Sequence, residues 1–240
     1  MSDVTILFTA TIDPGDTIFV ARADPLVRLR DYEVALSKWI SVGLGVDFVF
    51  FENSGYDLTS LKRIVSKQPG AEVEFISIRE NGGGKGKGYS EILGIKRAFE
   101  ISEVLMQSKF VIKCTGRLFV DNARHVVERL QLETFDVMCT LRRNLSFADS
   151  FFFAATPKFF VNELVPRVDI VDDSMGVYFE HALACAAASV VAQRGAWRPL
   201  PVLPRMVGIS GTEGTSMTKT MFAARSREIY HLMRNFVYRR

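Results

Sequence analysis

The stretch Phe110-Val-Ile-Lys-Cys-Thr-Gly-Arg-Leu-Phe-Val-Asp-Asn122 decides the fold class and places a candidate site within it. Its apolar run from Phe110 to Ile112 is typical of a buried strand, and a second short apolar run follows from Leu118 to Val120. Between the two runs lie two cations, a threonine and a glycine: Lys113, Thr115, Gly116 and Arg117. Because ligands of open α/β sheets bind at the carboxyl ends of strands, we expect a nucleotide here.

The two cations, Lys113 and Arg117, stand beside groups that suit phosphate. An arginine guanidinium presents a planar fork of donors to phosphate oxygens, and Gly116 lets a ligand approach the backbone closely. The simpler interpretation is that both cations are solvated charges at a strand end. We favour phosphate binding because the cations, Thr115 and the glycine cluster at one predicted strand terminus.

Apolar runs elsewhere predict the rest of the sheet. Strands are expected over Val4–Ala10, Val46–Phe51 and Val73–Ile78, and apolar residues at helical spacing predict a helix over Pro25–Val42. Continuous apolar strands separated by helices indicate an α/β fold, with a mostly parallel central sheet and helices on both faces. At 240 residues, of which 48% are hydrophobic, the chain can bury the core of one domain.

The 110–122 stretch resembles the strand of GT-A-fold glycosyltransferases that ends in an Asp-x-Asp motif, whose carboxylates hold a divalent metal against the nucleotide diphosphate. Thr115, Gly116 and Arg117 stand here in place of those acids, and the segment is similar to the Lys-x-Thr-Gly-Arg-Tyr signature of some bacterial surface-polysaccharide glycosyltransferases. The resemblance implies one GT-A-like, Rossmann-like domain over residues 1–240. It also implies transfer of a sugar from a nucleotide-sugar donor to a surface polysaccharide or lipopolysaccharide. Because hard cations need oxygen ligands, the missing acids predict transfer without a metal or another cofactor, although a divalent metal stays open.

Two further segments carry the same resemblance. Lys87-Gly-Tyr-Ser-Glu91 looks like a Lys-Gly-x-x-Glu segment of those enzymes, which implies that Lys87 and Glu91 contact the nucleotide. Asn53, at the end of the second predicted strand, stands where the family meets the base or ribose; turn formation is the simpler role for it. The Gly-rich stretch 81–89 is either a flexible surface loop or a lid over the donor phosphates, and it is not a Walker A motif.

Glu180 and His181 are the candidate catalytic residues, on or near the start of a predicted buried helix over Ala182–Ala192. Inverting sugar transfer needs a general base beside the acceptor hydroxyl. Inverting GT-A enzymes carry an acidic base at about this relative position, so the resemblance favours Glu180, although histidine is a base near neutral pH without tuning. The alternatives are that Glu180 complements the helix N-terminus and His181 is a polar neighbour, or that Asp172 and Asp173 are the acids or metal ligands.

Charge and composition limit the partners. The net charge of +3 gives no argument for nucleic acid, and three widely spaced cysteines form neither a disulfide framework nor a zinc pattern. Asp3 before the first apolar run argues against a secretory signal, so we expect a cytoplasmic enzyme. A basic amphipathic helix predicted at about 218–240 suggests peripheral contact with the inner face of a membrane and a lipid-linked glycan acceptor; packing against the domain is the simpler alternative.

Two other functions remain open. A sugar-phosphate nucleotidyltransferase could use the same architecture, but such enzymes usually carry a Gly-rich loop just after the first strand, and the segment Thr9–Thr17 contains only Gly15. The second is a non-catalytic module that binds a nucleotide or a glycan.

Overall fold

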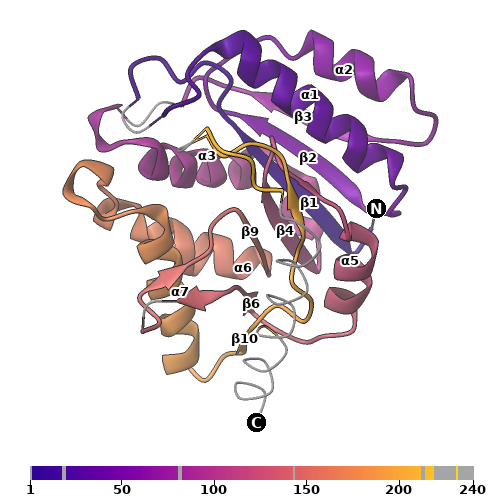
Figure 1. Ribbon diagram of the computed structural model, residues 1–240. Coiled ribbons are helices and arrows are strands. Elements are labelled where there is room, and N and C mark those ends of the chain that lie inside the picture. The colour runs from indigo at the N-terminus through magenta and orange to yellow at the C-terminus, as the bar shows by residue number, and fades with distance from the viewer. Residues whose placement is uncertain are drawn as a thin grey trace.

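The computed structural model describes residues 2–17, 20–80, 83–142, 144–211, 214–218 and 231. Within these residues, seven strands form one central sheet in the order β10-β6-β9-β4-β1-β2-β3 (Figure 1). All neighbouring pairs are parallel except those that β9 makes with β4 and β6. The strands are β1 (Val4–Ala10), β2 (Asp47–Glu52), β3 (Val73–Ser77), β4 (Phe110–Thr115), β6 (Val137–Met138), β9 (Phe152–Ala155) and β10 (Trp197–Arg198).

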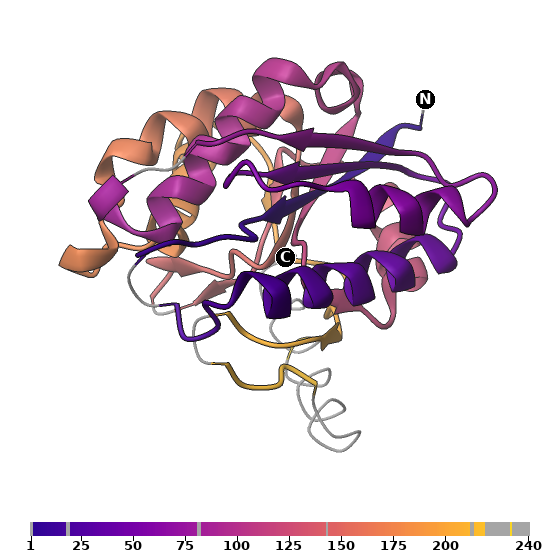
Figure 2. The same cartoon turned by 90° about the horizontal axis from the view of Figure 1, so that it is seen from above.

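Helices cover both faces of this sheet, which gives three layers (Figure 2). One face packs on α1 (Pro25–Ser41), α2 (Thr59–Ser66) and α5 (Ala123–Gln131). The other packs on α3 (Lys87–Ile101), α4 (Glu103–Gln107), α6 (Pro157–Phe159) and α7 (Phe179–Ala192). The α/β fold with a mostly parallel sheet, expected from the apolar runs, is therefore confirmed.

Alternation along β4 divides its side chains between the two layers. Phe110 and Ile112 are buried with α1 and α5, whereas Val111 is buried with α3 and α7. Lys113 therefore points toward the α3 and α7 layer, because it follows the same alternation as Val111. The strand extends two residues beyond Lys113, so this lysine lies inside the sheet and not at its end.

Shorter elements complete the described chain. They are β5 (Phe119–Val120) paired with β11 (Met206–Val207), the hairpin of β7 (Leu141–Arg142) and β8 (Phe147–Ala148), and the short helical turns Gly83–Lys85, Phe160–Leu164, Val165–Ile170 and Asp173–Met175.

Most predicted elements agree with the structure to within a few residues. The first strand runs over Val4–Ala10 as expected, and the first helix ends at Ser41. The helix expected from Ala182 begins earlier, at Phe179, so the two catalytic candidates lie within its first turn. The predicted helix at about 218–240 lies outside the described residues apart from 218 and 231, and the membrane contact assigned to it stays a prediction. Where the chain is described, the structure contains no helix long and apolar enough to span a bilayer.

The carboxyl ends of β1, β2 and β4 meet at one edge of the sheet because these strands are parallel. β9 runs in the opposite direction, so its amino end reaches the same edge. The backbone N–H of Thr115 donates to the carbonyl of Phe151 at 3.0 Å, which fixes the approach to β9 beside the end of β4. The next residue back, Ser150, is thereby brought to the edge where a ligand would bind.

Candidate functional site

A cavity of about 210 Å³ opens at this edge of the sheet. Its walls come from the ends of β1, β2 and β4, the first turns of α1, α3 and α7, and the segments around residues 150 and 210. Among the described residues, six charged side chains line it: Arg28, Lys87, Glu91, Arg117, Asp173 and Glu180.

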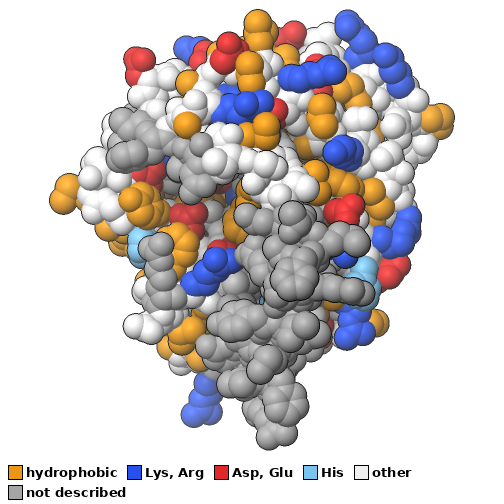
Figure 3. All heavy atoms as spheres, in the orientation of Figure 1, with side chains coloured by type: hydrophobic (Ala, Val, Ile, Leu, Met, Phe, Trp, Pro, Cys, Tyr) orange, Lys and Arg blue, Asp and Glu red, His pale blue; other side chains and the backbone are white. Residues whose placement is uncertain are grey.

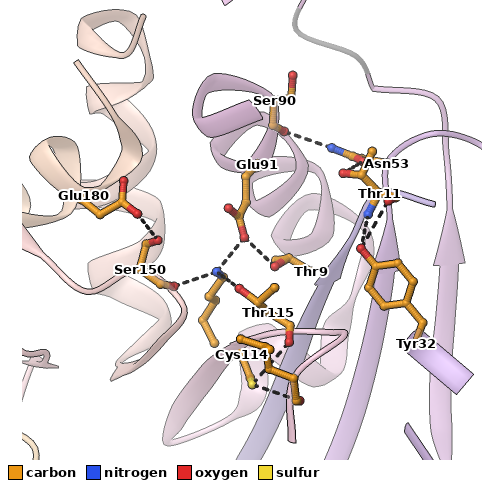
Figure 4. A network of polar contacts seen from close by, with 12 residues as sticks. Thr9, Thr11, Tyr32, Asn53, Ser90, Glu91, Cys114, Thr115, Ser150 and Glu180 are labelled. Carbon is orange, nitrogen blue, oxygen red and sulfur yellow. Dashed lines mark hydrogen bonds and ion pairs between the residues drawn. The ribbon is translucent and has the colours of Figure 1, made fainter. Parts of the chain in front are cut away.

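At one end of the cavity, polar residues that directly follow β1 and β2 form hydrogen bonds with one another and with groups on α1 and α3 (Figure 4). The hydroxyl of Thr11 donates to Asn53 Oδ1 at 2.6 Å, and Asn53 Nδ2 donates to the Ser90 carbonyl at 3.4 Å. Arg28 Nε donates to the Thr11 carbonyl at 2.7 Å, and the Thr11 N–H donates to Tyr32 Oη at 3.0 Å. Asn53 therefore lines the cavity, with its amide oriented by protein partners, and its contact with a base or ribose stays a prediction.

Glu52 holds the loops behind this wall. Its side chain is fully buried, and its carboxylate accepts backbone N–H groups from Ile12 at 2.9 Å, Ser54 at 3.0 Å and Tyr56 at 2.9 Å. Hydrogen bonds to an ionised acceptor are the stronger kind. A single carboxylate at the end of β2 thus ties together the loops that follow β1 and β2.

Lys113 lies beneath the cavity and not on its wall. Its side chain is 0% exposed, and Nζ lies 2.6 Å from Glu91 Oε1, 2.7 Å from the Ser150 carbonyl and 3.4 Å from Thr115 Oγ1. Glu91 Oε1 also accepts the hydroxyl of Thr9 at 2.6 Å. Burial by itself would raise the pKa of the Glu91 carboxyl, but Lys113 and Thr9 outweigh it, and the pKa is lowered.

Asp173 occupies the N-terminus of α3. Its Oδ2 accepts the N–H of Gly88 at 3.0 Å, whereas Oδ1 is buried and has no hydrogen-bond partner among the described residues. A side chain on Gly86, where φ is +96°, would place Cβ 2.5 Å from Asp173. The helix N-terminus that follows the Gly-rich stretch therefore binds a carboxylate of the protein itself. Asn81 and Gly82 of that stretch lie outside the described residues.

Burial shifts the pKa values of Asp173 and Lys87 in opposite directions, because it disfavours the charged form of each. It raises the pKa of the Asp173 carboxyl. It lowers the pKa of the Lys87 ammonium, against the opposing influence of Glu180, Asp173 and Glu91. Lys87 therefore lies within electrostatic reach of three carboxylates on the cavity wall.

Arg117 and Thr115 line the cavity, but Gly116 does not. Arg117 Nε donates to the Ile209 carbonyl at 3.2 Å, and Ser210 and Gly211 line the cavity beside it. Gly116 serves the backbone: its N–H donates to the Thr9 carbonyl at 2.9 Å. Ser210 and Gly211 thus border the cavity next to Arg117, and residues 212 and 213 lie outside the described part of the chain.

Glu180 and His181 are separated by the structure. Glu180 lines the cavity, and its Oε1 accepts the hydroxyl of Ser150 at 2.8 Å (Figure 4). His181 instead caps α7: its Nδ1 accepts the Tyr178 N–H at 3.0 Å, and its ring lies nearly perpendicular to that of Phe147, with 5.3 Å between the ring centroids. The geometry favours Glu180 as the group that meets a ligand.

Ser150, Arg28 and Tyr32 line the cavity although the sequence did not single them out. Ser150 lies in a segment dominated by aromatic residues, and Arg28 is a buried arginine on α1 that follows the exposed side chains of Leu26 and Val27. The sequence signal available for Arg28 was its position, because it is a basic residue on the helix that follows the first strand and lies one turn before Tyr32.

The described part of the chain contains no cluster of metal-ligating side chains. No group of three His, Cys, Asp or Glu side chains is placed there to hold an ion, and the strand end that would carry metal-binding acids offers Thr115, Gly116 and Arg117. Acidic and basic side chains are mixed over the face shown in Figure 3, in the area that the described residues form. That mixture gives no electrostatic argument for a nucleic-acid partner.

No protein-family model and no curated protein matches the chain by sequence. Solved structures match its fold. The glycosyltransferase GlyE of Streptococcus pneumoniae aligns with a TM-score of 0.52 at 9% identity, over 84% of this chain and 46% of GlyE. The galactosyltransferase LgtC, solved with donor and acceptor sugar analogues, aligns with a TM-score of 0.50 at 10% identity, over 75% of this chain and 69% of LgtC.

A third match is 4-diphosphocytidyl-2C-methyl-D-erythritol synthase of Anaerococcus prevotii, with a TM-score of 0.46 at 11% identity over 95% of this chain and 98% of that one. The chain spans about half the length of GlyE and about two-thirds of LgtC. The matches to GlyE and LgtC show that the chain has the GT-A-like fold of nucleotide-sugar transferases.

Proposed function

We propose that the chain is a glycosyltransferase that moves a sugar from a nucleotide-sugar donor to a hydroxyl of a surface polysaccharide or lipopolysaccharide, with inversion and without a metal. One observation carries the proposal. In a GT-A-like fold, two cations, Lys87 and Arg117, line the same cavity as Glu180.

The residues divide the reaction between them. Glu180 accepts the proton of the acceptor hydroxyl while that oxygen forms a bond to the anomeric carbon of the donor sugar. The bond from the anomeric carbon to the phosphate oxygen breaks, and its electron pair leaves with the nucleoside diphosphate. Lys87 and Arg117 stabilise the negative charge that develops on this leaving group. Attack on the face opposite the leaving group inverts the anomeric centre.

The donor also needs a place for its base and ribose. The hydrogen-bonded wall of Thr11, Arg28 and Asn53 lies on the cavity at the ends of β1 and β2. Its groups are held by the protein before a ligand arrives, which reduces the ordering cost of binding. We assign the nucleoside to this end and the acceptor to the end formed by Glu180.

The first test is thermal unfolding with CMP, UDP, GDP and dTDP, each in EDTA and in Mn²⁺. A nucleotide at 100 times its Kd stabilises the folded state by about 2.7 kcal/mol, so one nucleotide should raise the Tm in EDTA. Arg117→Ala should remove most of the shift, and Arg129→Ala, an exposed arginine on α5, should leave it intact. No shift with any nucleotide would contradict donor binding, and a shift only with Mn²⁺ would contradict the metal-independent reaction.

The second test separates transfer from the alternatives. Wild type should release the nucleotide that binds (UDP, GDP, dTDP or CMP) from the corresponding sugar donor, faster when a glycan acceptor is present. Release of pyrophosphate from a nucleoside triphosphate and a sugar 1-phosphate would instead identify a nucleotidyltransferase. Binding without either reaction would identify a binding module.

A further inference from the structure

We propose that Lys113 is a positioning residue: its buried ammonium fixes Ser150 and the start of α7, and thereby holds Glu180 toward the cavity. The inference rests on the proposed function, because it assigns a role within the same site. It replaces the direct phosphate contact that the sequence suggested for Lys113.

The ammonium of Lys113 has no donor left for a ligand. Each of its three N–H groups has an acceptor, on Glu91, on the Ser150 carbonyl and on Thr115. The side chain is 0% exposed, so a donor phosphate could reach it only by displacing these partners. Its contacts are internal, and they join α3, β4 and the approach to β9.

Two separate contacts lead from Lys113 to Glu180. The first passes through Ser150, whose carbonyl accepts from Lys113 Nζ at 2.7 Å while its hydroxyl donates to Glu180 Oε1 at 2.8 Å. The second passes through Phe179, whose ring centroid lies 5.4 Å from Lys113 Nζ. Phe179 is the first residue of α7 and directly precedes Glu180. Lys113 thus restrains the side chain of Glu180 through Ser150 and the backbone of Glu180 through Phe179.

Glu91 makes this buried cation possible. An unpaired buried ammonium would lose its charge or destabilise the fold, and the carboxylate at 2.6 Å compensates it. The pair is anchored in turn by Thr9 at the end of β1, which donates to Glu91 Oε1. β1, α3, β4 and the approach to β9 meet at this ion pair and form the floor of the cavity. A substitution in the pair should therefore shift Glu180 and leave distant surfaces in place.

The role can be tested without leaving a buried charge unpaired. Lys113→Met alone would strand Glu91, so the informative variant combines Lys113→Met with Glu91→Gln, where the introduced amide can still accept from Thr9. The matched control combines Lys96→Met with Glu100→Gln, an exposed pair on α3 with 3.9 Å between Lys96 Nζ and Glu100 Oε1. Both should fold, as circular dichroism and the Tm would report.

The second variant leaves the ion pair in place. Ser150→Ala removes the hydroxyl that Glu180 accepts but keeps the carbonyl that Lys113 holds. Ser150→Thr restores a hydroxyl at the same position. If Ser150 served only the stability of the fold, the hydroxyl of Ser150→Thr would not restore the activity that Ser150→Ala loses.

The readout is steady-state release of nucleotide from UDP-, GDP-, dTDP- and CMP-sugars, together with the KM for the donor that turns over. We expect the double variant and Ser150→Ala to lower kcat about 10- to 100-fold with less than a threefold change in KM, because small misplacements of a reacting group cost that much. Ser150→Thr should recover most of the loss. If these variants left kcat unchanged, with or without a raised KM, the positioning role of Lys113 would be contradicted and the proposed function would stand. No release by wild type from any of these donors would instead overturn the proposed function, before any variant is compared.

Discussion

The carboxylate of Asp173 accepts the backbone N–H of Gly88 at 3.0 Å and so takes the place of an anion at the N-terminus of α3. The first N–H groups of a helix have no partner within the helix, and no side chain of the N-cap position, Gly86, can supply one. The two glycines leave room for the acid, since a Cβ on Gly88 would lie 2.8 Å from Asp173 Oδ1. This part of the Gly-rich loop therefore serves an internal carboxylate.

Replacing Asp173 by asparagine should raise stability at neutral pH. Burial raises the pKa of the Asp173 carboxyl, so the folded state holds its proton more tightly than the unfolded chain does. The ionised carboxylate then costs stability at every pH above its folded pKa, and this cost disappears as pH falls toward the ordinary value of 3.8. Urea unfolding of wild type and Asp173→Asn should show a gain for the variant at about pH 7 that shrinks toward about pH 4. A gain that is independent of pH would exclude this explanation.

Glu52→Gln should destabilise the fold by about 2 kcal/mol, because the new amide turns one oxygen that accepts N–H groups into a donor. The carboxylate is fully buried and its hydrogen bonds come largely from backbone groups that cannot turn away. Urea unfolding measures the loss. Glu100→Gln, on a half-exposed pair of α3, should change stability by less than about 0.5 kcal/mol. Equal effects of the two substitutions would argue against Glu52 as the organiser of these loops.

The three cysteines should differ sharply in reactivity. Cys114 and Cys139 are buried, and Cys185 is exposed. Burial raises the pKa of the Cys114 thiol to about 12, despite the neighbouring cations, so its reactive thiolate is scarce at neutral pH. We expect a thiol reagent such as DTNB to modify one cysteine in the native protein and three after unfolding. Cys185→Ser should abolish the native reaction; rapid labelling of that variant would contradict the buried position of the other two.

The strands were predictable because their signal is local. A run such as Val4–Ala10, buried along its whole length, is apolar residue by residue and shows its boundaries in the sequence itself. The same local pattern placed the predicted end of the fourth strand at Ile112, because a lysine is usually a solvated residue at a strand terminus. The strand continues to Thr115 because β1 and β9 pair with it on both sides, which only the tertiary structure reveals.

The site was predictable only where its residues follow strand ends or begin helices. Lys87, Glu91, Arg117 and Glu180 meet on one cavity because parallel strands bring their carboxyl ends to one edge. The partners of Lys113 could not be read from its neighbours, because Glu91 lies 22 residues earlier and Ser150 lies 37 residues later. Ser150 reaches the cavity through the antiparallel direction of β9, and no periodicity in the sequence announces that direction.

The two catalytic candidates should respond in opposite ways to substitution. Glu180→Gln removes the proton acceptor from the cavity wall but keeps the shape and the hydrogen bond from Ser150, so transfer should fall about 10²- to 10⁴-fold with little change in Tm. His181→Ala removes the acceptor of the Tyr178 N–H at the start of α7, so it should cost about 1 kcal/mol of stability and leave kcat nearly intact at temperatures below the transition. Thermal unfolding and donor turnover, measured on both variants, separate the two roles. If His181→Ala abolished turnover while preserving Tm, the base would have to be reassigned to the histidine.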